Sequence, residues 1–191
     1  FDLPVRDEAT PGYRQRVDDW HDAIAQVWKD TILAEIGPSG RVALLVWGDP
    51  SLYDSTLRIA GRLTGVFDLR VDVIPGITSL QALTAAHAIP INDIGAPFIV
   101  TTGRKLREEG WPPGVDRVAV MLDGECSFRA LPADNIHIWW GAYVGMQEQI
   151  TLSGPLAELA DRIVHTRAQA RAARCWHNPA QGARVRREEV P

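Results

Sequence analysis

The sequence of 191 residues has little cysteine, no long apolar run and no excess of positive charge. Its two cysteines, Cys126 and Cys175, are too few for a disulfide framework, and neither belongs to a Cys-x-x-Cys pair. We therefore expect reduced thiols without a zinc or redox role. The longest notable apolar run, residues 42–47, is far shorter than the roughly 20 residues that span a bilayer, and no charged-then-apolar leader opens the chain. These absences predict a cytoplasmic protein without a membrane partner.

The charge balance argues against nucleic acid as a partner. Twenty Lys and Arg against 24 Asp and Glu leave a net charge of −4, which supplies no basic field to neutralise phosphates. The only dense group of arginines lies in the C-terminal tail, where Glu188 and Glu189 stand beside it. The 46% apolar content is that of a folded globular protein.

Several catalytic signatures are also missing. There is no Gly-x-Gly-x-x-Gly fingerprint and no phosphate-binding Gly-x-x-x-x-Gly-Lys-Ser/Thr loop, which argues against a nicotinamide cofactor and ATP chemistry. Without a Gly-x-Ser-x-Gly elbow, a serine hydrolase would lack its nucleophile. No two histidines lie three to five residues apart, so we expect no metal site and a structural or solvated role for each of them: His21, His87, His137, His165 and His177.

Helices and strands are expected to alternate in the first half of the chain. Thr10 followed by Pro11 predicts the start of an amphipathic helix, which should end at Gly37-Pro38. The apolar run that follows predicts a strand covered on both faces. The expected elements after the first helix are a strand over 42–47, a helix over 55–63, a strand over 69–74 and a helix over 79–87.

The second half is richer in strands, and we place a domain boundary near residue 95. Strands are predicted over 98–101, 118–122, 136–140 and 149–153, before a helix that runs from Pro155 to about Arg174. The expected fold is α/β, with an α/β domain over 1–95, a mixed domain over 96–191 and a cleft between them. From about residue 175 the tail has neither helical nor strand periodicity, so we expect it to be loose.

Two turns follow the predicted strands of the first half, where an open α/β sheet binds its ligands. The first is Gly48-Asp49-Pro50-Ser51-Leu52-Tyr53 and the second is Pro75-Gly76-Ile77-Thr78-Ser79. Taken alone, the first is a tight turn and the second a helix cap. The Asp49 carboxylate either accepts hydrogen bonds from a ligand or stabilises its own turn.

Together the two turns resemble the signature loops of the tetrapyrrole (corrin/porphyrin) methyltransferases, which bind S-adenosylmethionine between two α/β domains. The resemblance covers nearly the whole chain. Segments 45–56, 81–90, 121–128 and 139–143 look like one branch of this family, in which C-1 methylation of precorrin-5 in aerobic cobalamin biosynthesis is coupled to loss of acetate. The resemblance implies a small corrinoid substrate, a homodimer and no metal.

The resemblance also implies where S-adenosylmethionine binds. The first loop would wrap the methionine end of the cofactor, largely through backbone groups, and the second loop would hold the other side. A strand residue would pack beside the adenosine. The implied residues are Gly48, Asp49, Leu52, Tyr53, Thr78, Ser79 and Met121.

The implied reaction has two parts with different needs. Methyl transfer needs the attacking carbon held at about 3–3.5 Å from the methyl group, and no strong base. Release of acetate needs a group that activates water and donors for the developing oxyanion. The candidates, on loops expected to face the cleft, are Tyr53, Arg104, Asp123 and Glu125, and each has a solvated or structural alternative. Arg104 has the further alternative of pairing with a substrate carboxylate.

Other observations keep alternatives open. Trp139 and Trp140 either offer a face to the macrocycle or belong to core or dimer packing. The chain starts at Phe1 rather than Met and lacks a match to the family's first Gly-rich loop, so we expect an N-terminal truncation. The polar tail over 175–191 is also unlike the family's closing strand. The alternatives are another precorrin C-methyltransferase, or an inactive fragment that binds S-adenosylmethionine.

Overall fold

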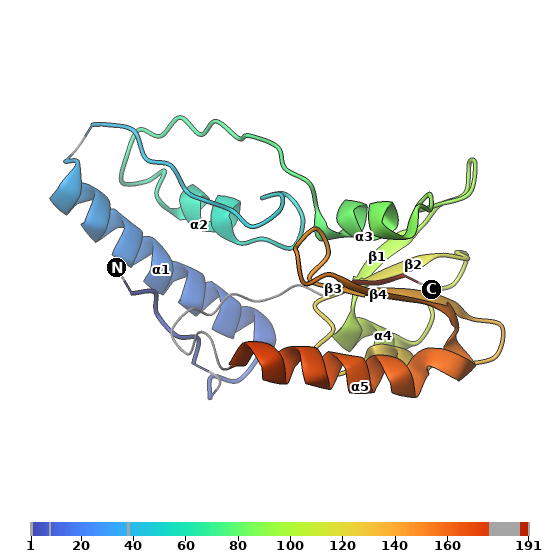
Figure 1. Ribbon diagram of the computed structural model, residues 1–191. Coiled ribbons are helices and arrows are strands. Elements are labelled where there is room, and N and C mark those ends of the chain that lie inside the picture. The colour runs from blue at the N-terminus through green and yellow to red at the C-terminus, as the bar shows by residue number, and fades with distance from the viewer. Residues whose placement is uncertain (1, 8, 38, 176–187, 191) are drawn as a thin grey trace. The chain divides into compact units, whose positions relative to one another are not determined.

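The computed structural model describes residues 2–7, 9–37, 39–175 and 188–190 (Figure 1). The chain forms two compact units, Phe1–Ile77 and Thr78–Pro191. The helix over 79–87 therefore belongs to the second unit, whereas the boundary expected near residue 95 would place it in the first. In the described part of the chain, no helix is long and apolar enough to cross a membrane.

The first unit contains two helices, α1 (Tyr13–Glu35) and α2 (Thr56–Arg62). Helix α1 begins two residues later than the Thr10-Pro11 signal indicated, because the Thr10 hydroxyl donates to Asp7 Oδ2 (3.0 Å) instead of capping the helix. It ends at Glu35, just before Gly37, as predicted. The helices pack through buried apolar residues with aromatic side chains around them, and the buried set is Ile24, Ala25, Ile59 and Leu63.

The strands predicted over 42–47 and 69–74 are not formed, and this is a correction. Neither segment pairs with another strand, and apolar side chains in both face solvent, including Trp47 at 70% exposure. An apolar run forms a strand only where a neighbouring strand completes its backbone hydrogen bonds. The described residues of the first unit include no such neighbour.

The second unit is built on a five-stranded sheet (Figure 1). The order is β1-β2-β5-β3-β4, in which β1 and β2 are parallel and the other neighbours are antiparallel. Four strands confirm the predicted positions to within a few residues. The bounds are β1 Ile99–Thr102, β2 Val118–Met121, β3 His137–Ala142, β4 Ile150–Pro155 and β5 Glu188–Val190.

Strand β5 corrects the expectation of a loose tail that is unlike a closing strand. Residues 188–190 lie between β2 and β3 and pair antiparallel with both. A strand between β2 and β3 is held by backbone hydrogen bonds to both neighbours, and these do not require an apolar sequence. The polar residues 188–190 therefore have no periodicity that predicts a strand. The rest of the expected loose segment, 176–187, lies outside the described residues.

Helices cover both faces of the sheet (Figure 1), with α3 (Ser79–His87) on one face and α4 (Gly103–Glu109) and α5 (Leu156–Cys175) on the other. Successive side chains of β3 point to opposite faces of the sheet. Trp140 packs with Leu156 and Ile163 of α5 on one face, and Trp139 packs with Leu83 of α3 on the other. Trp140 is fully buried, which confirms core packing for this residue. Helix α4 and the short 3₁₀ helix Ser127–Ala130 were not predicted.

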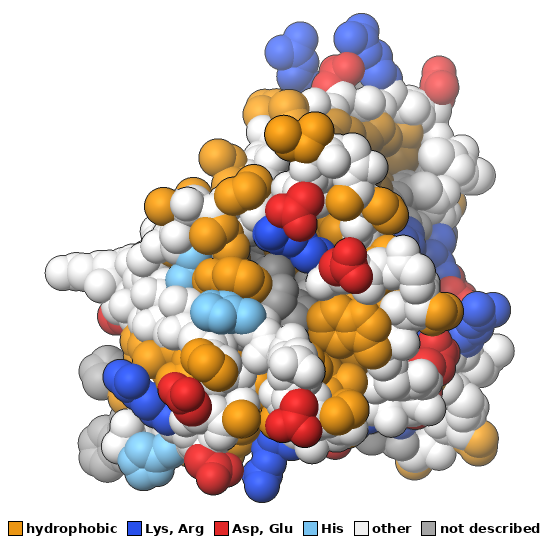
Figure 2. Space-filling model, turned by 90° about the vertical axis from the view of Figure 1, so that its right-hand side faces the viewer, with side chains coloured by type: hydrophobic (Ala, Val, Ile, Leu, Met, Phe, Trp, Pro, Cys, Tyr) orange, Lys and Arg blue, Asp and Glu red, His pale blue; other side chains and the backbone are white. Residues whose placement is uncertain are grey.

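The surface agrees with the small net charge. On the face shown in Figure 2, acidic, basic and hydrophobic side chains are interspersed.

Candidate functional site

The two signature turns of the first unit are tied together by Asp49. Its Oδ2 accepts a hydrogen bond from the backbone N–H of Gly76 (2.8 Å), and its Oδ1 accepts from the backbone N–H of Ser51 (2.8 Å) and from the Ser51 hydroxyl. The hydrogen bond from the Ser51 side chain, followed by those from the Gly76 and Ser51 backbone, lowers the pKa of Asp49. The carboxylate therefore stabilises its own turn and also holds the next loop against it.

Glycine is required where the two turns meet. A Cβ at Gly76 would overlap the carbonyl oxygen of Gly48, so the two backbones approach more closely than any other residue would permit. Gly48 itself has φ 86°, in the left-handed region that favours glycine. The two loops are therefore held in close contact with each other.

Leu52 and Tyr53 continue the first loop, and both are half-buried. Tyr53 has φ 51°, which is uncommon for a residue with a bulky side chain and is typical of functional loops. Burial raises the pKa of the Tyr53 phenol, so it keeps its proton at neutral pH. It is available there as a hydrogen-bond donor rather than as a base.

Thr78, Ser79 and Met121 belong to the second unit. Thr78 caps α3: its Oγ1 accepts from the backbone N–H of Gln81 (3.2 Å), and its own N–H donates to Gln81 Oε1 (2.9 Å). The helix-cap prediction for this turn is thus confirmed. Ser79 opens α3, and the side chain of Met121 lies in the core at 1% exposure.

Asp123 organises the loop that follows β2. It is 3% exposed, its Oδ2 accepts from the Ser127 N–H (2.6 Å) and hydroxyl (2.8 Å), and its Oδ1 accepts from the Glu125 N–H (3.2 Å). Gly103 at the start of α4 makes room for this carboxylate, because a Cβ there would overlap it. Asp123 therefore has little free hydrogen-bonding capacity.

Glu125 and Arg104 are more exposed than Asp123. The Glu125 carboxylate lies 3.3 Å from Arg107, which also lies 3.8 Å from Asp123. Arg104 is on α4, where it lies 3.7 Å from Glu108 one turn along. Its expected place on a loop is thus corrected, because Thr102 accepts from the Lys105 N–H and starts a helix at Gly103.

Arg167 was missed by the sequence reasoning. This α5 side chain is buried, and it donates to the backbone oxygens of Asp123 (3.2 Å) and Gly124 and lies 3.5 Å from Cys126 Sγ. It neutralises part of the negative charge around Asp123 and ties the loop to α5. The sequence around Arg167 is a helical segment of mixed polarity, which does not indicate that this arginine is buried. Only the folded structure shows its position.

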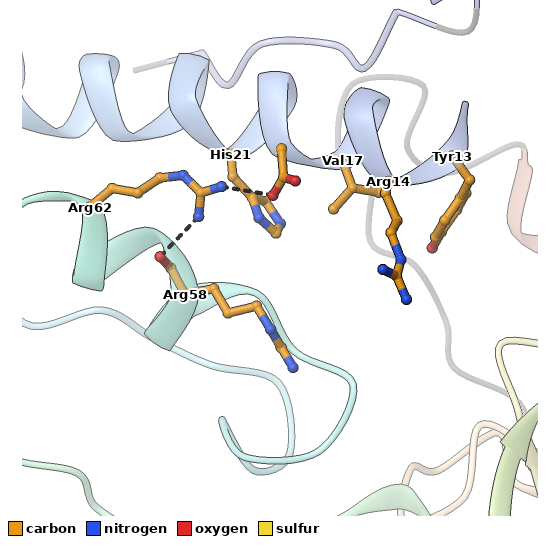
Figure 3. A pocket seen from close by; sticks show the side chains of 7 residues that line it. Tyr13, Arg14, Val17, His21, Arg58 and Arg62 are labelled. Carbon is orange, nitrogen blue, oxygen red and sulfur yellow. Dashed lines mark hydrogen bonds and ion pairs between the residues drawn. The ribbon is translucent and has the colours of Figure 1, made fainter. Parts of the chain in front are cut away.

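His21 and Ser55 form a second cluster that was missed. His21 is 2% exposed, and its Nε2 lies within hydrogen-bond distance of Ser55 Oγ (2.8 Å). Burial lowers the pKa of His21, and the nearby Arg62 lowers it further. This pair lies beside a cavity between α1 and α2 (Figure 3). The structural role expected for His21 is confirmed, but the cavity was not foreseen.

The chain has an α/β fold, and comparison with known proteins identifies its class as that of the methyltransferases. The family of tetrapyrrole (corrin/porphyrin) methylases matches residues 3–160, and the chain belongs to this family. It is 48% identical, over 178 residues, to a precorrin-6A synthase (deacetylating) from Sinorhizobium sp. That match covers 92% of this chain and 68% of the relative.

Solved structures agree with this assignment. A cobalamin-synthesis-related protein from Corynebacterium diphtheriae has a TM-score of 0.74 and 36% identity, over 93% of this chain and 71% of that one. Uroporphyrin-III C-methyltransferase from Thermus thermophilus, in complex with S-adenosylhomocysteine, has a TM-score of 0.55 and 16% identity, over 88% of this chain and 71% of that one. The second likeness shows the fold alone.

Proposed function

We propose that the protein methylates C-1 of precorrin-5 with S-adenosylmethionine and releases acetate, giving precorrin-6A. One observation carries the proposal: the 48% identity to a precorrin-6A synthase (deacetylating) over 92% of the chain. The hydrogen bonds of Asp49 to Ser51 and Gly76, called the Asp49 clasp below, add support. They preorganise the two loops that resemble the family's cofactor loops.

The loops suit a sulfonium cofactor. They present backbone groups with few charged side chains, and their one carboxylate, Asp49, is occupied by hydrogen bonds within the loops. S-adenosylmethionine supplies an electrophilic methyl group on its sulfonium when bound. We assign its binding to backbone groups of Gly48, Leu52 and Tyr53 in the first unit, with Asp49 holding that loop in shape. In the second unit we assign it to Thr78, Ser79 and Met121.

The candidate catalytic residues take different roles under this proposal. Tyr53 is protonated and donates to a developing oxyanion, and the exposed Glu125 carboxylate accepts the proton of the attacking water. Water adds to the acetyl carbonyl, the bond to the macrocycle breaks, and the ring carbon keeps the electron pair while acetate leaves. Asp123 positions the loop that carries Glu125, and Arg104 pairs with a substrate carboxylate.

Cofactor binding is the first test. Calorimetry should detect one-to-one binding of S-adenosylhomocysteine to the wild-type chain. Binding should be lost in Asp49→Ala, which opens the clasp, and in Thr78→Trp, which fills the second loop. The matched control is Asp72→Ala, which removes an exposed aspartate of the same unit that pairs only with exposed Arg70. If Asp49→Ala and the control bind S-adenosylhomocysteine equally well, Asp49 does not contribute to the cofactor site.

Turnover of precorrin-5 then tests the reaction. The proposal requires a product one methyl group heavier and one acetyl group lighter, with acetate released in equal amount. A methylated product without acetate would assign the chain to another precorrin C-methyltransferase. Cofactor binding without any turnover would identify a fragment that binds S-adenosylmethionine but is inactive.

A homodimer, which rests on the family resemblance, and a cytoplasmic location, which the sequence analysis predicts, are further parts of the proposal. Analytical ultracentrifugation at several concentrations measures the first, and a monomer at all of them would contradict it. Fractionation of cells that express the complete protein measures the second.

A further inference from the structure

A cavity of about 460 Å³ in the first unit lies between α1 and α2 (Figure 3). Its volume falls in the range of small-molecule sites, about 300–1,000 Å³. Tyr13 and Val17 of α1 supply apolar surface, and His21 lines its inner side. Its charged lining residues are three arginines, Arg14 of α1 and Arg58 and Arg62 of α2, and one carboxylate, Asp18.

The three arginines differ in how far their charge is neutralised. Arg62 forms ion pairs with Asp18 (3.0 Å) and Asp22 (2.5 Å) of α1, so its charge is more than neutralised within the protein. Arg58 donates to the backbone oxygen of Asp54 (2.7 Å), which is a neutral group. Arg14 makes no hydrogen bond or ion pair with any residue that the structure describes.

His21, a further polar side chain in the lining, carries no charge. His21 is held against Ser55 Oγ, and burial together with the positive charges of Arg62 and Arg58 lowers its pKa, so it is neutral at pH 7. Asp18 is the only carboxylate in the lining, and it is engaged by Arg62. The cavity thus carries two guanidinium groups, from Arg14 and Arg58, that have no anionic partner among the described residues.

We propose that Arg14 and Arg58 bind a carboxylate arm of a polycarboxylate macrocycle, with the apolar surface of Tyr13 and Val17 beside the arm. A guanidinium is a rigid fork of N–H donors that matches a carboxylate, and two such forks on one concave surface, with no carboxylate partner in the described part of the chain, attract such a group strongly. The macrocyclic source of the carboxylate rests on the proposed function. Binding of an oxyanion to the cavity does not.

Fluorescence titration with uroporphyrin I, a macrocycle with acetate and propionate arms, tests this site on the full chain. Arg14→Gln and Arg58→Gln should each weaken binding about tenfold, which is the loss expected for one charge-assisted hydrogen bond to a carboxylate. The matched control is Arg70→Gln, which removes an equal charge from the same unit at an exposed position outside the cavity. It should change the dissociation constant less than twofold.

Three results would overturn the proposal. The first is no binding of uroporphyrin I to the wild type, and the second is the same affinity in Arg14→Gln, Arg58→Gln and Arg70→Gln. The third is displacement of uroporphyrin I by citrate at equal concentration, which would identify a site for free small carboxylates instead. Unchanged circular dichroism shows that the variants fold. Retained binding of S-adenosylhomocysteine shows that the cofactor site is intact, so failure of this site and failure of the proposed function are distinguishable.

Discussion

Similar apolar segments adopt different structures in the two units. Residues 118–121 form a strand whose four residues are all buried, whereas residues 42–47 form no strand and leave Trp47 70% exposed. Both segments are short apolar runs next to glycine-containing turns. The difference is that β2 has neighbours on both sides, β1 and β5, and helices over the sheet. Strand formation therefore depends on the neighbouring strands and helices as much as on the sequence of the segment itself.

A pair of tryptophan substitutions measures this contrast most directly. Trp140→Ala in the second unit should cost about 3–5 kcal/mol of unfolding free energy, because it empties a fully buried site. Trp47→Ala in the first unit should change it by about 0.5 kcal/mol or less. Urea denaturation followed by circular dichroism measures both. Similar losses in the two variants would mean that segment 42–47 is packed in solution.

Asp123→Ala tests whether the loop after β2 is held by its buried carboxylate. The change leaves the Ser127 N–H and hydroxyl without their acceptor in a buried place, and we expect a loss of about 2–4 kcal/mol. Asp116→Ala, at an exposed aspartate of the same unit, is the control and should be nearly neutral. The comparison is made by chemical denaturation at neutral pH, and equal stability of the two variants would contradict a structural role for Asp123.

Two glycines of the first unit should respond in opposite directions. Gly76→Ala should destabilise by about 1–3 kcal/mol, because its Cβ meets the Gly48 carbonyl oxygen and the loops must separate. Gly61→Ala, within α2 with open space around it, should stabilise by about 0.5–1 kcal/mol. Thermal denaturation measures both shifts. A stable Gly76→Ala variant would show that the two turns are not in close contact.

The smallest effect expected is the pH dependence of the Asp49 clasp. Hydrogen bonds from the Ser51 side chain, then from the Gly76 and Ser51 backbone, lower the pKa of Asp49 below its ordinary value of 3.8. Its contribution to stability is thus present above pH 3.8 and is lost as the pH falls through the lowered pKa. Asp49→Asn should be less sensitive to acid over this interval than the wild type. Parallel stability curves down to pH 2 would contradict the clasp.

The sequence predicted local features well where local forces decide them. The helix at Ser79–His87 was found to the residue, because Thr78 and Gln81 form a capping box and Pro90 follows. It also indicated the paired turns, since Gly48, Asp49 and Gly76 meet a geometric need that few residues satisfy. It could not find Arg167 or the cavity around Arg14 and Arg58, because these depend on residues far apart in the chain.

The sequence by itself determined the family, the paired turns, the cap of α3 and the strands β1 to β4, since these depend on motif, local hydrogen bonds and periodicity. Only the tertiary structure decided that residues 42–47 stay unpaired, that Glu188–Val190 enters the sheet, and that Arg58 and Arg14 line one cavity. The physical reason is the same in each case. Strand pairing and the balance of charge depend on partners that only the folded chain brings together.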